Sequence, residues 1–117
     1  MDHIQELVDA AVENIMNDKE NSHLLQTGKV RFAVGDGRIG VPSEAPFDLI
    51  HIGAACPTLP TILLDQLKVG GMLIAPVGRD FQRLCKYLKK EDGSLQEEHI
   101  ATVMFVPLTD KEAQLKK

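Results

Sequence analysis

The chain of 117 residues has no tryptophan, one tyrosine and two cysteines. Cys56 and Cys85 lack the C-x-x-C spacing of common zinc sites and redox pairs, so the sequence predicts no metal site. No apolar run approaches the ~18 residues that span a bilayer. The first residues, Met1 to His3, lack the basic and apolar pattern of a signal peptide. Together these absences favour a cytoplasmic protein with reduced thiols.

An excess of positive charge is also missing. Thirteen Lys and Arg residues stand against 17 Asp and Glu residues, which gives a formal net charge of −4. A nucleic-acid-binding domain typically carries a basic patch, and Lys86, Lys89 and Lys90 are better explained as the solvated end of a strand. We therefore expect neither a nucleic-acid partner nor a membrane partner. A hydrophobic content of 44% and a charged content of 26% are typical of a single globular domain.

The hydrophobic pattern predicts alternating helices and strands. Apolar residues recur at helical spacing across residues 4–16, which predicts an amphipathic helix with one buried stripe and Asp2 as its N-cap. The polar residues 17–29 are expected to end this helix. The remaining pattern predicts strands at residues 30–34, 47–53 and 72–77, loops at residues 35–46 and 54–60, and a helix at residues 61–67.

A β-hairpin is predicted near the C-terminal end. Residues 82–90 and 95–107 flank Glu91 to Ser94, and a short loop that contains glycine is typical of a hairpin turn. Residues 100–106 are dense in apolar side chains and are expected to form a buried strand. Parallel strands followed by this hairpin predict an α/β fold with a mixed sheet and a C-terminal antiparallel hairpin.

Two strand ends predict a ligand site. Asp36 lies between Gly35 and Gly37 just after the expected strand at residues 30–34, and ligands of open α/β sheets bind outside the carboxyl ends of strands. The next strand, at residues 47–53, is largely apolar, which is typical of a strand with helices on both faces. We therefore interpret His51 as a buried core histidine rather than a general base.

Four sequence strings resemble one enzyme family. GDGR, FDLIHIGAAC, LLDQLKVGGMLIAPVG and VPLTDKEAQ are similar to segments of the protein-L-isoaspartate (D-aspartate) O-methyltransferases, in the same order. The resemblance implies a Rossmann-like fold that uses S-adenosyl-L-methionine to methylate isoaspartyl residues of damaged proteins and peptides. The first strands and the Gly-rich loop of that fold are missing. We therefore expect residues 1–117 to be a C-terminal part with little activity alone.

The resemblance also implies a set of cofactor-binding residues. Asp2 matches the acid that accepts hydrogen bonds from the ribose hydroxyls, and His3 is its neighbour. A carboxylate suits this role because it offers only acceptors to a diol. Asp36 matches the residue that accepts from the adenine amino group, with Gly37 beside it.

Two further groups follow from the same resemblance. Thr109 and Gln114 belong to the segment that closes over the cofactor in the family. The cleft near the reacting carboxyl is expected to be lined by Ala54, Ala55, Val77 and Gly78. No catalytic acid or base is assigned, because the acceptor carboxylate is already ionised at pH 7 and the reaction is mainly a matter of positioning.

Simpler interpretations remain open. Asp2 can be a helix cap alone, Asp36 can stabilise its own loop by an Asx-turn, and Thr109 and Asp110 can be turn residues. Cys56 is better explained as a small buried apolar residue than as a nucleophile. At the level of function, a methyltransferase for another substrate and a non-catalytic module that binds an adenosyl ligand or a partner stay as alternatives. Open sheet edges would favour self-association of such a module.

Overall fold

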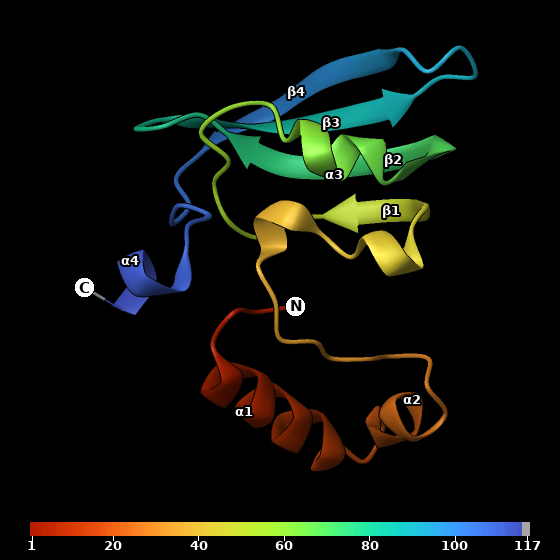
Figure 1. The fold of residues 1–117 in the computed structure, drawn as a ribbon, viewed down its shortest axis with the longest axis vertical. Helices are drawn as coiled ribbons and strands as arrows, with labels where there is room; N and C mark the ends of the chain where they lie inside the picture. The colour runs from red at the N-terminus through yellow and green to blue at the C-terminus, as the bar shows by residue number, and fades with distance from the viewer. Residues whose placement is uncertain (116–117) are drawn as a thin grey trace. The chain divides into compact units, whose positions relative to one another are not determined.

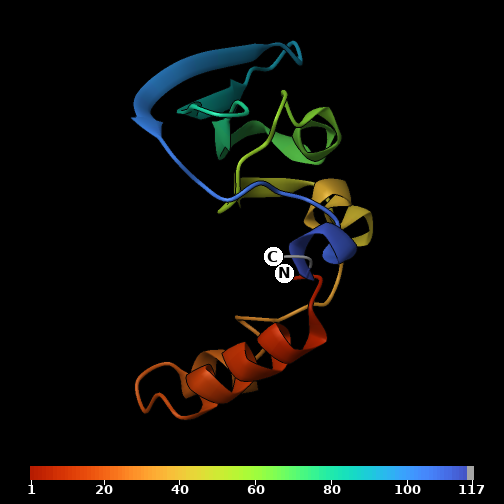
Figure 2. The same cartoon turned by 90° about the vertical axis from the view of Figure 1, so that its left-hand side faces the viewer.

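The computed structural model describes residues 1–115 and divides the chain into two compact units. The first unit holds Met1–Gly37 together with the segment that starts at Asp110, and the second unit is Arg38–Thr109. The second unit carries the sheet and one α-helix, and the first carries the other described α-helices (Figure 1 and Figure 2). Among residues 1–115, no helix has the length and apolar character needed to cross a membrane.

The first unit contains α1 (Gln5–Met16), α2 (Ser22–Gln26) and α4 (Lys111–Leu115). The predicted helix over residues 4–16 is confirmed, but only part of its apolar stripe is buried: Ile4 and Val8 are in the core, whereas Leu7 and Met16 are about half exposed. The prediction of Asp2 as N-cap is wrong, because Ile4 occupies that position. The polar residues after α1 were expected only to end that helix, but they also contain α2. The sequence did not predict α2 because its apolar residues show only weak helical periodicity.

The predicted strand at residues 30–34 is also wrong. In this segment the structure has a single parallel bridge, which joins Val34 to Asp2. A β-ladder needs a partner that extends along its length, and here the paired chain turns into α1 directly after Asp2. Apolar, β-branched residues therefore gave a strand signal that the local pairing does not support.

The second unit is built on a four-stranded mixed sheet in the order β1-β2-β3-β4 (Figure 1). Its strands are β1 (Phe47–His51), β2 (Leu67–Val77), β3 (Gln82–Lys89) and β4 (Leu95–Val103). β1 pairs with β2 in parallel, and β2, β3 and β4 pair antiparallel. The mixed sheet and the C-terminal hairpin are confirmed as predicted. Between β1 and β2 the chain crosses through α3 (Thr61–Asp65).

The core lies between α3 and one face of this sheet. It comprises Ile52, Cys56, Leu63, Leu64, Leu67, Leu73, Ala75, Cys85 and Tyr87. On the same face, Lys89 Nζ donates to the carbonyl of Leu67 at 3.0 Å and to that of Leu64 at 3.4 Å. The ammonium group thereby satisfies carbonyls at the C-terminal end of α3, where a cation is favoured by the helix dipole.

A buried glutamine fixes the segment before β1. Gln66 is 7% exposed; its Nε2 donates to the Ile39 carbonyl at 2.8 Å, and its Oε1 accepts from the Val41 amide at 3.0 Å. The backbone of Phe47 donates to the Gln66 carbonyl at 2.8 Å. These bonds hold the short 3-10 turns at Gly37–Ile39 and Pro42–Glu44 against the beginning of β2.

Three expectations for the strands are corrected. β2 begins at Leu67 rather than Met72, because the segment expected to close the helix instead continues into the sheet. His51 is exposed and Leu49 is 59% exposed, so β1 is not covered on both faces. The C-terminal strand was expected to run to residue 107 and to be buried, but β4 ends at Val103, Ile100 is 52% exposed, and Val106, beyond the strand, is 60% exposed. The exposure of β1 and β4 has one cause: in the described sheet both are edge strands.

Candidate functional site

Asp2 and the segment before Asp36 are held together by backbone pairing in the first unit. The Asp2 amide donates to the Ala33 carbonyl at 3.1 Å, and the Gly35 amide donates to the Asp2 carbonyl at 2.9 Å. The pairing is parallel, so the two short extended segments run in the same direction. Two acids that are 34 positions apart in the sequence are thereby brought onto neighbouring segments, which are joined by a single bridge outside the four-stranded sheet.

The carboxylate of Asp2 has acceptor capacity left over. It is half-buried, and its Oδ1 accepts from the Ile4 amide at 3.0 Å. A carboxylate has about four lone-pair positions, so this bond leaves room for further donors. A Cβ at Gly35 would lie in ordinary van der Waals contact with the Met1 thioether, at 3.4 Å. Asp36 and Gly37 are half-buried at the same turn.

The C-terminal helix joins the same unit through His3. The His3 ring forms a hydrogen bond with the Gln114 side chain, across 111 positions of sequence. Asp110 organises the helix: its carboxylate accepts from the Ala113 amide at 2.7 Å and its carbonyl from the Gln114 amide at 3.1 Å. The structure therefore brings five of the six predicted cofactor residues into one unit, and the sixth, Thr109, is the last residue of the other.

The residues predicted to line the substrate cleft meet in the second unit. The Ala55 amide donates to the Val106 carbonyl and the Leu108 amide donates to the Ala55 carbonyl, both at 2.7 Å. On its other side the loop is fixed by Cys56, whose amide donates to the Pro76 carbonyl at 2.8 Å and whose carbonyl accepts from Gly78 at 2.8 Å. Ala54, Ala55, Val77 and Gly78 thus lie on two directly paired segments.

These four residues differ in what they can contact. Ala55 is 2% exposed and uses both its backbone groups in pairing, so it positions the loop. Ala54, Val77 and Gly78 are half-buried and can face a ligand. Their role at the substrate stays a prediction. The segment that pairs with Ala55 lies after β4, at the end of the strand predicted for residues 95–107, and the sequence gave no signal for this pairing.

Cys56 and His51 do not form a catalytic pair. Cys56 is 4% exposed, and burial raises the pKa of its thiol, so the reactive thiolate is disfavoured. His51 is exposed on β1. A small cavity of about 180 Å³ beside Cys56 is lined by Thr58–Leu63 and Leu108, among others. Pockets that bind drug-sized ligands enclose roughly 300–1,000 Å³, so this cavity is too small for a nucleoside.

The chain is similar to one family of enzymes along nearly all its length. The family model described as Protein-L-isoaspartate(D-aspartate) O-methyltransferase (PCMT) matches residues 1–113. Protein-L-isoaspartate O-methyltransferase 1 of Arabidopsis thaliana is 47% identical over 116 residues, which cover 99% of this chain and 50% of the relative. The Triticum aestivum protein-L-isoaspartate O-methyltransferase is 45% identical with the same coverage. The chain therefore spans about half the length of these curated relatives.

A solved structure shows the same fold. A putative protein-L-isoaspartate O-methyltransferase from Plasmodium falciparum, crystallised with S-adenosyl-L-homocysteine, matches with a TM-score of 0.73 at 31% identity. The match covers 92% of this chain and 50% of that one. The mixed sheet, its parallel crossover through α3 and this likeness agree with the predicted Rossmann-like methyltransferase fold.

Proposed function

Because the chain belongs to the protein-L-isoaspartate(D-aspartate) O-methyltransferase family, we propose that it is the C-terminal part of such an enzyme. The enzyme transfers a methyl group from S-adenosyl-L-methionine to the α-carboxyl of isoaspartyl or D-aspartyl residues in damaged proteins. The observation that supports the proposal is the backbone pairing of Asp2 with Gly35, which brings Asp2 next to the segment that carries Asp36.

The residues of the first unit suit an adenosyl group. Asp2 offers carboxylate lone pairs to the ribose hydroxyls, while its Oδ1 is steadied by the Ile4 amide. Asp36 accepts from the adenine amino group, and Gly37 leaves space beside the base because it has no Cβ. The Gln114 side chain orients the His3 ring at the same site. Thr109 directly precedes Asp110 in the sequence, and the family resemblance implies that it belongs to the segment that closes over the cofactor.

The second unit contributes the substrate side. Ala54, Val77 and Gly78 have no ionisable side chains, so none of them forms an ion pair that would weaken a peptide carboxylate as a nucleophile. When bound, S-adenosyl-L-methionine supplies an activated methyl group on a sulfonium. The residues of this chain then act by positioning, which is sufficient for a reaction between a good nucleophile and a good leaving group.

A hybrid protein tests this assignment. We would join the N-terminal half of the Arabidopsis thaliana relative to Met1 and assay methylation of an isoaspartyl peptide against its aspartyl counterpart. Activity on the isoaspartyl peptide alone supports the proposal. A hybrid that folds and binds S-adenosyl-L-homocysteine without methylating either peptide would instead indicate an adenosyl-binding module.

Two substitutions in the hybrid test the nucleoside contacts. Asp2→Asn and Asp36→Asn each remove a charge-assisted hydrogen bond worth about 1.5–3 kcal/mol, which corresponds to roughly 10- to 100-fold weaker binding of S-adenosyl-L-homocysteine. Asp9→Asn is the matched control, because Asp9 is an exposed acid on α1. Equal affinities for all three variants would contradict the assigned contacts.

The chain alone is proposed to have little activity. Titration calorimetry of the 117 residues with S-adenosyl-L-homocysteine should show binding much weaker than that of the hybrid, and micromolar affinity would overturn this expectation.

We also propose a cytoplasmic location and self-association through the sheet edges. Cys56 and Cys85 are free thiols, which suits a reducing compartment. The outer edge of β4 and the segment after it expose apolar side chains, with Met104 at 78% and Val106 at 60%. Such an edge tends to pair with another chain. Sedimentation velocity should show dimers or larger species, and a strict monomer would contradict the second point.

A further inference from the structure

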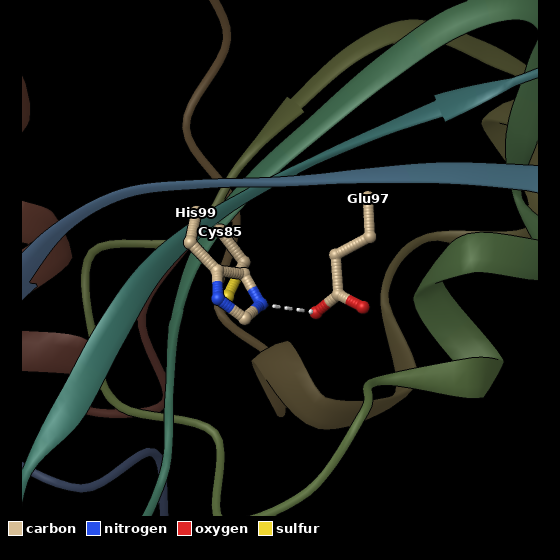
Figure 3. A group of neighbouring side chains, drawn as sticks. All are labelled: Cys85, Glu97 and His99. Atoms are coloured by element: carbon tan, nitrogen blue, oxygen red, sulfur yellow. Dashed lines mark hydrogen bonds and ion pairs between the residues drawn. The ribbon is translucent and has the colours of Figure 1, made fainter.

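A second cluster of chemically active side chains lies on the β3–β4 hairpin. Cys85 on β3 is paired directly with His99 on β4, and the neighbouring pair on the same face is Tyr87 with Glu97. The Cys85 sulfur, a Glu97 carboxylate oxygen and a His99 ring nitrogen lie within 4.8 Å of one another. Figure 3 shows the three side chains on the same side of the hairpin.

The spacing of these atoms suits a tetrahedral metal ion. Ligand atoms 2.0–2.3 Å from a zinc ion lie about 3.3–3.8 Å from each other in a tetrahedron. Atoms that lie up to 4.8 Å apart must approach each other by up to about 1–1.5 Å to reach this spacing. Cys85 is 2% exposed and fixed in the core, whereas Glu97 and His99 are partly exposed and can adjust.

The charges of the cluster are also suitable. Burial raises the pKa of the Cys85 thiol, which donates to the Arg83 carbonyl at 3.3 Å, so metal binding releases this proton to solvent. The resulting thiolate and the Glu97 carboxylate carry two negative charges, which balance a divalent cation, and imidazole is a neutral ligand. Sulfur, nitrogen and oxygen donors together select Zn²⁺ and its chemical relatives over Mg²⁺ or Ca²⁺. In the structure the groups are linked to each other: His99 Nε2 is 3.0 Å from Glu97 Oε1, and Tyr87 OH donates to the same oxygen at 3.2 Å.

We propose that Cys85, Glu97 and His99 form a binding site for Zn²⁺ or a similar divalent transition-metal ion, with a fourth position open to water. Tyr87 is the positioning residue, because its hydroxyl fixes the orientation of the Glu97 carboxylate. The site is separate from the residues assigned to the nucleoside and the peptide, and the inference does not depend on the proposed methyltransferase activity.

One neighbour opposes the ion. Arg83 Nη1 lies 3.3 Å from His99 Nδ1. A guanidinium only donates, so Nδ1 accepts and the ring proton sits on Nε2, toward Glu97. Metal binding at Nε2 moves that proton to Nδ1 or to solvent and displaces Arg83, which is exposed and free to turn outward. Removing this arginine should therefore strengthen metal binding rather than weaken it.

Cobalt is the probe, since Co²⁺ replaces Zn²⁺ and gives a charge-transfer absorption band only when a thiolate coordinates it. The untagged 117-residue chain is titrated with Co²⁺, and Zn²⁺ is then added in competition. We expect one ion per chain, a thiolate band and loss of the band on adding Zn²⁺. Circular dichroism of each variant checks that the fold is kept.

Substitutions assign the ligands. Loss of an outer-sphere partner weakens metal binding by about 10- to 100-fold. His99→Gln, at a partly exposed position, and Cys85→Ser each remove a direct ligand, so each should weaken metal binding by more than this. Tyr87→Phe should weaken it within that 10- to 100-fold range, and Arg83→Met should strengthen it. Cys56→Ser is the matched control, since it removes the other buried thiol and should leave the band intact.

Three outcomes overturn the proposal. The first is the absence of a thiolate band in the folded chain. The second is a band that persists at the same cobalt concentration in both His99→Gln and Cys85→Ser. The third is a band that Cys56→Ser alone abolishes. Because His99→Gln does not touch the core, a folding failure of Cys85→Ser leaves the test decisive.

Discussion

Replacing Gly78 by alanine should be the most damaging glycine substitution of the second unit. Gly78 follows β2, has a φ of +135° and donates its amide to the Cys56 carbonyl at 2.8 Å. A Cβ at this position would lie 2.3 Å from the Phe81 carbonyl oxygen and 3.2 Å from Gln82 Cα. Both contacts are with backbone atoms, so the clash cannot be relieved by turning a side chain.

The magnitude follows from two separate effects. A non-glycine residue in this backbone region costs about 1–3 kcal/mol. Forcing the turn apart to admit the methyl group adds about 1–3 kcal/mol, as other overpacked sites do. We expect Gly78→Ala to lower the free energy of unfolding by about 2–6 kcal/mol, and to loosen the loop at Ala54 and Ala55 that Cys56 anchors.

Two other glycines separate these effects. Gly93, in the hairpin turn, has a φ of +85° with nothing within 4 Å of an added Cβ, so Gly93→Ala should cost the strain alone, about 1–2 kcal/mol. Gly53 has neither a positive φ nor a close neighbour, and Gly53→Ala should change stability by less than about 0.5 kcal/mol. Urea unfolding followed by circular dichroism measures the series. A Gly78→Ala loss no larger than that of Gly93→Ala would refute the steric argument.

Three further outcomes are expected. Gln66→Met removes two hydrogen bonds and should cost about 1–3 kcal/mol in the same urea assay, whereas the exposed control Gln96→Met should be nearly neutral. Hydrogen bonds from the Ser94 hydroxyl and amide hold the pKa of Asp92 below its usual 3.8. The Asp92 carboxylate therefore stabilises the turn above pH 3.8, and this stabilisation is lost as the pH falls further. An NMR titration midpoint for Asp92 at or above 3.8 would contradict this. Burial and the raised pKa of Cys56 should make its alkylation by iodoacetamide at least about tenfold slower in the native chain than in urea, and equal rates would show that the thiol is accessible.

The sequence predicted local elements better than their surroundings. Helical periodicity located α1, and the glycine-containing turn located the β3–β4 hairpin, because both signals act over a few neighbouring residues. Burial was predicted poorly, as the exposed His51 and Ile100 show. An apolar strand is buried only if another layer covers it, and neither composition nor alternation specifies which edge of the sheet a strand will occupy.

The candidate site, like the fold, was predicted from the sequence only where the signal is local. Asp36 between two glycines was recognisable from local sequence, but the bond between His3 and Gln114 joins opposite ends of the chain and was not predicted; the family resemblance only assigned both residues to the cofactor site. The cluster of Cys85, Glu97 and His99 was missed because a search for closely spaced cysteines does not compare two strands. The predicted turn could have indicated the cluster, because it fixes the register of the two strands. Lys89 pairs with Leu95, and the same register continued along the strands places Cys85 opposite His99.

Backbone pairing explains how the fold tolerates large changes in sequence. The bonds that bring Asp2 to Gly35 and Ala55 to Val106 are made by amide and carbonyl groups, which every residue except proline provides in full. Side-chain identity is therefore weakly constrained along these segments, in agreement with the TM-score of 0.73 to a structure that shares only 31% of its sequence. Side-chain identity is strictly constrained where a Cβ would clash with the backbone of the paired segments, and Gly78 is such a position.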